Sequence, residues 1–227
     1  VSDAWPLSGS EKLIVVEGIP RTGKKQFAAK LARTLQYHRI DEPVPDSGIL
    51  TSFYRGGERY TLATELYFLV ARYKQLSEAM ERDLFSPSET VLSFMMEKSR
   101  IYASMTLSDE EQRIYDSIYG MLSRTGIEPE LVVYLYADPS VILRRVRSAP
   151  ITGEEFMTRE YIESLTEAYH AFFYRYTTCP VVFFDVGEYP DWDTHGDAVV
   201  DDLIRYASQV KPGANFYVPR ISTHGGV

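Results

Sequence analysis

The chain has 227 residues, of which 44% are hydrophobic, and its formal net charge at pH 7 is −8. This length suits one large α/β domain with a sizeable core, and the acidic balance argues against a nucleic-acid or anionic-membrane partner. Cys179 is the only cysteine, which excludes an internal disulfide and indicates the cytoplasm or another reducing compartment.

The first predicted elements are a strand and a helix near the N-terminal end. Residues 1–11 are polar and have no hydrophobic period, so we expect a flexible leader there. Residues 12–16 form an apolar, β-branched run that is typical of a buried strand. Residues 24–35 carry apolar side chains at helical spacing, which predicts a helix.

The loop between these two elements has the spacing of a phosphate-binding motif. Gly18, Gly23 and Lys24 match G-x-x-x-x-G-K-[S/T], in which backbone N–H groups, the helix N-terminus and the lysine ammonium hold phosphate. The last position is Lys25, so a second cation replaces the hydroxyl that would hold Mg²⁺. Arg21 is a third cation, and three cations on one loop predict an anion there. That anion is a nucleotide, free phosphate, or a carboxylate from a partner or from this chain.

The rest of the chain alternates short apolar strands with amphipathic helices. Strands are predicted at 38–44, 90–95, 131–136 and 181–185, and helices at 58–80, 158–176, 197–210 and after the capping box that begins at Ser108. Such alternation indicates a parallel sheet, here of five strands, with helices on both faces. One domain is expected at 12–210 and a C-terminal tail at 211–227, and ligands of such sheets bind beyond the carboxyl ends of the strands.

Several segments, taken in order, resemble the deoxynucleoside kinase family, and specifically its bacterial deoxyadenosine/deoxyguanosine kinase-like branch. Val16-Glu17-Gly18 resembles the end of the family's first strand, and Asp41-Glu42-Pro43 resembles the E-P that ends the second. Residues 65–75 are similar to the long helix that lines the nucleoside pocket. Residues 93–103 and 135–141 resemble the segments around the third and fourth strands.

This resemblance implies a three-layer fold of the P-loop NTPase type with a lid segment, ATP or another phosphate-bearing ligand at the loop, and often a homodimer through a helix pair. It makes Glu42 the candidate base for the sugar 5′-hydroxyl. Arg145, beside Arg144 and Arg147, is the best candidate for a lid arginine that contacts phosphate. The residues that it places in the nucleoside pocket are Glu65, Tyr67, Arg72 and Phe94.

The chain departs from the family pattern where phosphate chemistry would take place. Besides Lys25, residues 91–94 read Val-Leu-Ser-Phe where the bacterial kinases resemble V-S-D-Y, so a carboxylate of the metal site is missing. The expected lid tip carries Glu154 and Glu155, whose charges would repel a phosphate. We therefore predict no metal site in this chain.

Two main hypotheses follow. In the first, the protein is a catalytically degenerate member that keeps an anion- or nucleotide-binding loop and acts through protein interaction, as an accessory or regulatory subunit of a complex. In the second, it is an active ATP-dependent deoxynucleoside kinase with an altered site. A kinase for a different small-molecule acceptor is a third possibility. No apolar stretch reaches 18 residues, so insertion into a membrane is not expected.

Overall fold

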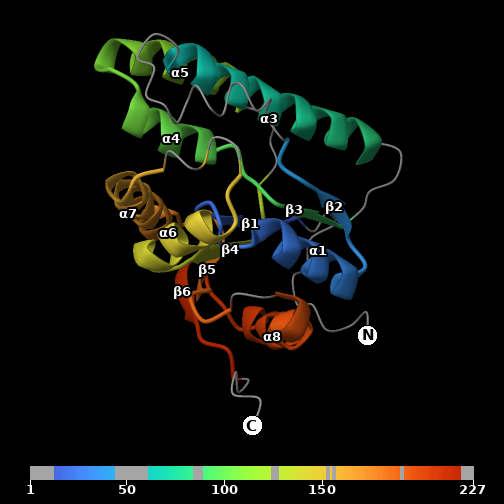
Figure 1. Ribbon diagram of the computed structural model, residues 1–227. Coiled ribbons are helices and arrows are strands. Elements are labelled where there is room, and N and C mark those ends of the chain that lie inside the picture. The colour runs from blue at the N-terminus through green and yellow to red at the C-terminus, as the bar shows by residue number, and fades with distance from the viewer. Residues whose placement is uncertain are drawn as a thin grey trace.

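The structure is a computed structural model that describes residues 13–43, 61–83, 89–123, 128–151, 154, 157–189 and 192–220. Within these residues six parallel strands form one sheet, in the order β2-β3-β1-β4-β5-β6 (Figure 1). The strands are β1 Leu13–Gly18, β2 His38–Ile40, β3 Thr90–Leu92, β4 Leu131–Tyr136, β5 Pro180–Asp185 and β6 Gly213–Tyr217.

Helices cover the sheet and add a further layer. They are α1 Lys24–Leu35, α3 Thr61–Asp83, α4 Lys98–Thr106, α5 Asp109–Leu122, α6 Pro139–Ser148, α7 Arg159–Arg175 and α8 Trp192–Ala207. Helix α1 packs on α8, α6 packs on α7, and α3 packs on α4 and α5. In Figure 1 the long helix α3 runs beside α5 at one end of the molecule, with α4 between this pair and the sheet.

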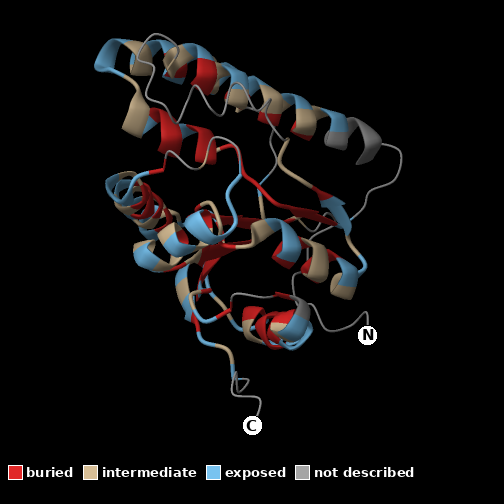
Figure 2. Ribbon diagram, viewed as in Figure 1, coloured by how far each residue is buried: buried red, intermediate tan, exposed pale blue. Residues whose placement is uncertain are grey.

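The central strands are buried because helices cover both faces of the sheet. The β1 and β4 sequences, LIVVEG and LVVYLY, are apolar runs rather than alternating patterns, as expected of parallel strands buried on two sides. Figure 2 shows the buried residues concentrated in the sheet and on the inner helix faces. The edge strand β2 instead exposes His38 and Arg39, and polar side chains protect a sheet edge from pairing with another chain.

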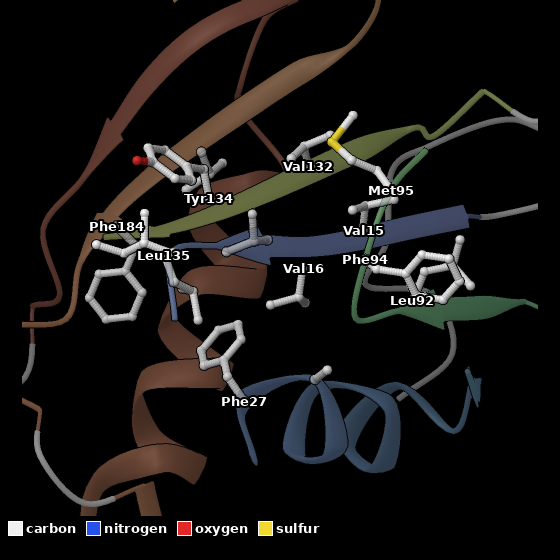
Figure 3. Close-up of a cluster of buried hydrophobic side chains, with 14 of the residues drawn as sticks. Val15, Val16, Phe27, Leu92, Phe94, Met95, Val132, Tyr134, Leu135 and Phe184 are labelled. Atoms are coloured by element: carbon white, nitrogen blue, oxygen red, sulfur yellow. The ribbon is translucent and has the colours of Figure 1, made fainter. Parts of the chain in front are cut away.

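Aromatic side chains fill the core on both faces of the sheet. On one face, Phe27 of α1 contacts Phe184 and Trp192, with ring centroids 6.1 Å and 5.0 Å away. On the other face, Tyr134 of β4 stacks on Tyr169 of α7 at 5.9 Å. Figure 3 shows Phe27 and Phe184 on one side of the sheet and Tyr134 on the other. The first cluster lies directly behind the loop that follows β1, so core packing positions that loop.

The predicted parallel α/β sheet is confirmed, but the expected number of five strands is wrong. Residues 213–217, which the sequence assigned to the C-terminal tail, pair with β5 as a sixth strand. This strand reads Gly-Ala-Asn-Phe-Tyr and is only partly buried, so it has no apolar run to mark it.

The predicted capping box is confirmed, since Ser108 Oγ accepts from Glu111 N–H and Glu111 Oε2 accepts from Ser108 N–H.

The sheet brings the ends of three strands together at one edge. Leu92 at the end of β3 pairs with Val15 of β1 on one side and with Ile40 at the end of β2 on the other. The residues that follow these strands therefore meet in space. The proposed leader, residues 1–11, and residues 221–227 lie outside the described part of the chain. None of the described helices combines the length and apolarity needed to cross a membrane.

Candidate active site

The loop between β1 and α1, residues 18–25, is here called the phosphate loop, and its two glycines are required by close contacts. A Cβ at Gly18 would lie 2.1 Å from the carbonyl oxygen of Leu135. A Cβ at Gly23 would lie 2.1 Å from Trp192 Nε1, and Gly23 has a φ of 81°, which disfavours any side chain. The carbonyl of Gly23 accepts from Phe27 N–H and thereby starts α1.

Carboxylates of this chain neutralise two of the three cations on the phosphate loop. Lys24 Nζ lies 3.0 Å from Glu17 Oε1 at the end of β1. Burial opposes the charged form of Lys24, but the charges of Glu17 and Glu42 raise its pKa. The Arg21 side chain is ion-paired with Glu154. The sequence predicted an anion at this loop without identifying it, and the structure has carboxylates of the chain itself there.

Lys25, the third cation, is exposed at the first turn of α1, and no ion pair involves it among the described residues. Ser93, at the place where the family pattern has a carboxylate, follows β3 and accepts a hydrogen bond from the backbone N–H of Glu42 (3.0 Å). The hydroxyl of Ser93 thus fixes the segment that carries Glu42.

Arg145 bonds backbone carbonyls beside the phosphate loop. Its Nη1 donates to the carbonyl of Arg21 (3.1 Å) and its Nη2 donates to the carbonyl of Val186 (2.7 Å). Burial and the neighbouring Arg144 lower the pKa of Arg145. In this arrangement the guanidinium joins the phosphate loop to the segment after β5, and it lines the cavity described below.

Glu42, the candidate base, lies within a cluster of cations. Its Oε1 accepts from Arg72 Nε (3.0 Å) and Nη2 (2.8 Å), and its Oε2 accepts from Lys98 Nζ (2.7 Å). Lys24 Nζ lies 3.9 Å from the same Oε2. Burial would raise the pKa of Glu42, but Lys98, Arg72 and Lys24 hold it well below the ordinary value. Glu42 is therefore ionised at neutral pH.

Lys98 is a site residue that the sequence analysis did not single out. It is the first residue of α4 and is buried, and burial together with the charges of Lys24 and Arg72 lowers its pKa to about 8 despite the nearby Glu42. The one sequence feature that could have pointed to Lys98 was its place in the segment 93–103, directly behind the third strand. Its side chain is turned inward by the fold, which the linear pattern does not reveal.

One cavity of about 680 Å³ joins the phosphate loop to the Glu42 cluster. Its volume is in the range of small-molecule sites. The chain lines it with four groups of residues: residues 20–26 of the phosphate loop and α1; Glu42, Pro43, Glu65, Phe68 and Arg72; Lys98 and Tyr102; and Arg145, Ser148, Ala149, Ile151, Glu154, Tyr189 and Trp192.

The cavity includes only part of the predicted nucleoside pocket. Glu65 and Arg72 line it, but Tyr67 is 42% exposed on α3 and Phe94 is fully buried in the core. Phe68 and Tyr102 are the aromatic side chains that line this region. For Tyr67, helix rotation explains the difference, because the adjacent residues 67 and 68 point about 100° apart on a helix. Phe94 instead follows β3 and packs in the core.

These features define a class of protein. A glycine-framed loop joins a central parallel strand to a helix N-terminus, and it opens into a cavity at the carboxyl edge of the sheet that contains several cations. This is the arrangement of a P-loop-type nucleotide-binding α/β protein. A sequence model of the family "Deoxynucleoside kinase" matches residues 14–206, and the chain belongs to that family.

Individual relatives support the same assignment. The chain is 28% identical over 156 residues to the deoxyguanosine kinase of Bacillus subtilis (strain 168), covering 69% of this chain and 75% of that protein. It is 24% identical over 212 residues to the deoxyadenosine kinase of Dictyostelium discoideum, covering 88% of this chain and 83% of that protein. The solved structure of deoxyadenosine kinase from M. mycoides with bound dATP shares the fold, with a TM-score of 0.66 and 20% sequence identity. The match covers 85% of this chain and 99% of that one.

Proposed function

We propose that this protein binds a nucleoside and a phosphate-bearing ligand in the one cavity, and that its phosphoryl-transfer activity is lost or greatly reduced. The observation that most directly supports this is the position of Lys25 at the first turn of α1, where the motif has a Mg²⁺-binding hydroxyl. An ammonium attracts phosphate, but it has no lone pair for a metal and no fixed octahedral geometry.

The oxygen donors near the phosphate loop do not suit Mg²⁺. The carboxylates of Glu17 and Glu42 are already bonded to Lys24 and to Arg72 and Lys98, and the Ser93 hydroxyl accepts from a backbone N–H. In the described part of the chain, no three His, Cys, Asp or Glu side chains gather as a metal site. No metal-held step is therefore part of the proposed function.

The remaining groups support binding of phosphate at the loop and of a hydroxyl group beside it. Phosphate oxygens at the loop would contact the backbone N–H groups at the start of α1 and the ammonium groups of Lys24 and Lys25. A ligand hydroxyl beside Lys24 would donate to the ionised Glu42, which Arg72 and Lys98 orient. Slow or absent transfer is expected because the described residues offer these cations but no set of Mg²⁺ ligands beside them, so the charge that develops on the transferred phosphoryl is only partly neutralised.

Such a protein would act through interaction, as an accessory or regulatory subunit or as a homodimer. Exposed apolar side chains on α3 and α5 support a contact through this helix pair: Tyr67 and Val70 on α3, and Ile114 and Met121 on α5. Light scattering of the purified chain tests the homodimer, and a mass of one chain at all concentrations would reject it.

An active ATP-dependent kinase that phosphorylates a nucleoside 5′-hydroxyl is the second candidate. Two observations favour it: Glu42 is ionised and lines the same cavity as Lys24, and the relatives described above are named deoxyguanosine and deoxyadenosine kinases. A positioned carboxylate is the usual base for a substrate hydroxyl in kinases.

A kinase assay separates the two candidates. The wild type, Lys25→Ser and the double variant Lys25→Ser/Ser93→Asp are incubated with ATP, Mg²⁺ and each of the four deoxynucleosides, with Lys74→Ser on the exposed side of α3 as the control. We expect wild type and control to turn over far below about 1 s⁻¹, the lower end for kinases, and the double variant to gain activity. Wild-type turnover above that value establishes the second candidate instead.

A further inference from the structure

Lys98 lies where three features of the fold oppose an ammonium charge. It is the first residue of α4, so the positive end of the helix dipole acts on it. Its side chain is only 7% exposed. Its Nζ and that of Lys24 share one carboxylate oxygen, Glu42 Oε2, at 2.7 Å and 3.9 Å, so the two ammonium groups are close neighbours. A buried lysine beside another cation gives up its proton more easily and then acts as a nucleophile.

The charges around Lys98 favour its neutral form on balance. The groups that face Lys98 or its carboxylate partners are Glu17 on β1, Lys24 on α1, Glu42 after β2, Arg72 on α3, Tyr102 on α4 and Tyr169 on α7. Burial, and then the charges of Lys24 and Arg72, outweigh the two carboxylates and lower the pKa of Lys98 to about 8. About a tenth of the molecules therefore carry a neutral Lys98 amine at pH 7.

This amine lies in the same cavity as the phosphate loop. Lys98, Glu42 and residues 20–26 all line the cavity of about 680 Å³. Lys24 belongs to the loop and adjoins Glu42, so a phosphate held by the loop would place the rest of a small ligand beside Lys98. The ionised Glu42, 2.7 Å from the Lys98 Nζ, can accept a proton from an attacking amine.

We propose that Lys98 forms an imine with a small aldehyde or ketone that carries a phosphate group. The neutral Nζ attacks the carbonyl carbon, which is the usual electrophile for a lysine amine. Glu42 relays a proton from the nitrogen to the oxygen, and the adduct then loses water to leave a C=N bond. The two amine hydrogens leave with the carbonyl oxygen as that water, so no oxidant or reductant is needed. The phosphate anchor rests on the proposed binding of phosphate at the loop.

Trapping with sodium borohydride tests this assignment, because it reduces an imine to a stable secondary amine. The wild type, Lys98→Met and Lys74→Met are incubated at pH 8 with glyceraldehyde 3-phosphate or with glyceraldehyde, and intact mass and peptide mapping locate the adducts. Lys74, with its side chain 75% exposed on α3, is the matched control. We expect the phosphorylated aldehyde to label Lys98 about 10-fold or more faster than glyceraldehyde does. Lys98→Met should lose this adduct, and ATP should slow its formation.

The pH dependence of labelling is a second measurement on the wild type. Only the neutral amine attacks, so the labelling rate at Lys98 should rise with pH and level off above about pH 8. Labelling of Nα-acetyl-lysine in the same solutions should continue to rise at higher pH, because an ordinary lysine has a pKa of about 10.4. Parallel profiles for Lys98 and the free amino acid overturn the assignment.

The outcomes separate this inference from the proposed function. Adducts spread evenly over the exposed lysines, adducts mainly at Lys24, or equal rates with the two aldehydes overturn the inference. If ATP binds in a calorimetric titration but Lys98 is not labelled, only the inference is rejected. If ATP does not bind and Lys98 is not labelled, the proposed phosphate binding at the loop is rejected as well. Should Lys98→Met fail to fold, the peptide map and pH profile of the wild type decide.

Discussion

Glu42 remains ionised inside the protein because three cations surround it. Arg72 and Lys98 are themselves buried, with side chains 6% and 7% exposed, so each depends on Glu42 for its counter-charge. Removing one partner of a buried pair leaves uncompensated charge and costs more than the pair itself contributes. Glu42, the candidate base, therefore also stabilises the fold. Its removal should lower the free energy of unfolding as well as weaken ligand binding.

We expect Glu42→Gln to destabilise the protein by about 3 kcal/mol at pH 7. The pKa of Glu42 is lower in the folded protein than in the unfolded chain. Its stabilising contribution is thus fully present above the unfolded pKa of about 4.3 and is lost as the pH falls toward the folded pKa. Urea unfolding of both proteins at pH 7, 5 and 3 measures this difference.

The difference between wild type and Glu42→Gln should be equal at pH 7 and 5 and smaller at pH 3. Glu163→Gln, which removes a carboxylate from an exposed ion pair with Arg159, serves as the control and should change stability by less than about 1 kcal/mol. A difference that stays constant down to pH 3 would show that Glu42 does not interact with cations as described.

The role of Gly23 depends on its contact with Trp192, a residue far away in the sequence. The space for a Cβ there is taken by the indole of Trp192, and the backbone has positive φ. We expect Gly23→Ala to destabilise the protein by about 2 kcal/mol or more and to weaken ATP binding, because the loop and Trp192 must separate. Thermal unfolding and calorimetric titration measure the two effects.

Gly120 provides a matched control for Gly23. It lies in α5, where a Cβ would have no atom within 4 Å. Alanine there is expected to stabilise the helix by about 0.5–1 kcal/mol, because glycine is a poor helix former. Equal effects of the two substitutions would contradict the close packing of Trp192 against the phosphate loop.

At the scale of elements, the phosphate loop is held between α1, α8 and α6. Asp197 of α8 is bonded to Lys30 and Arg33 of α1 at 2.9 Å and 2.7 Å. Arg145 of α6 bonds the carbonyl of Arg21 from the other side. The loop conformation is therefore determined by neighbouring elements as well as by its own glycines.

The pairing of Arg21 with Glu154 predicts competition between this carboxylate and a bound anion. We expect Glu154→Gln to tighten binding of ATP without metal by about 3- to 10-fold, because Arg21 becomes available to phosphate and a repulsive charge is removed. Calorimetric titration in the presence of EDTA measures this change, with Glu163→Gln as the control. Weaker binding by Glu154→Gln would indicate that Glu154 instead positions Arg21 for the ligand.

At the scale of the whole molecule, the cavity depends on the order of the strands. Glu42 follows β2, Ser93 follows β3, and the phosphate loop follows β1, and these three strands are neighbours in the order β2-β3-β1. Helix α3 adds Glu65 and Arg72 from outside the sheet. Segments far apart in the chain, from Pro20 to Trp192, therefore contribute to one site, as expected when ligands bind at the carboxyl edge of a parallel sheet.

The sequence by itself determined the features that local patterns encode. Apolar runs and helical spacing predicted the parallel α/β sheet, the glycine spacing predicted the phosphate loop, and the order of the segments indicated the family. The Ser108 capping box was also predictable, because it involves residues only three positions apart. The sixth strand was not, because only the last of its five residues, Tyr217, is buried and the strand carries no apolar run.

The tertiary structure alone decided which side chains meet in the cavity. Arg21 pairs with a residue 133 positions away, and Lys98 with one 56 positions away. The choice of Phe68 and Tyr102 over Tyr67 and Phe94 as cavity walls depended on the rotation of α3 and on the path of the chain after β3. Such contacts depend on strand order and helix packing, which local periodicity does not specify, because many arrangements bury the same apolar residues equally well.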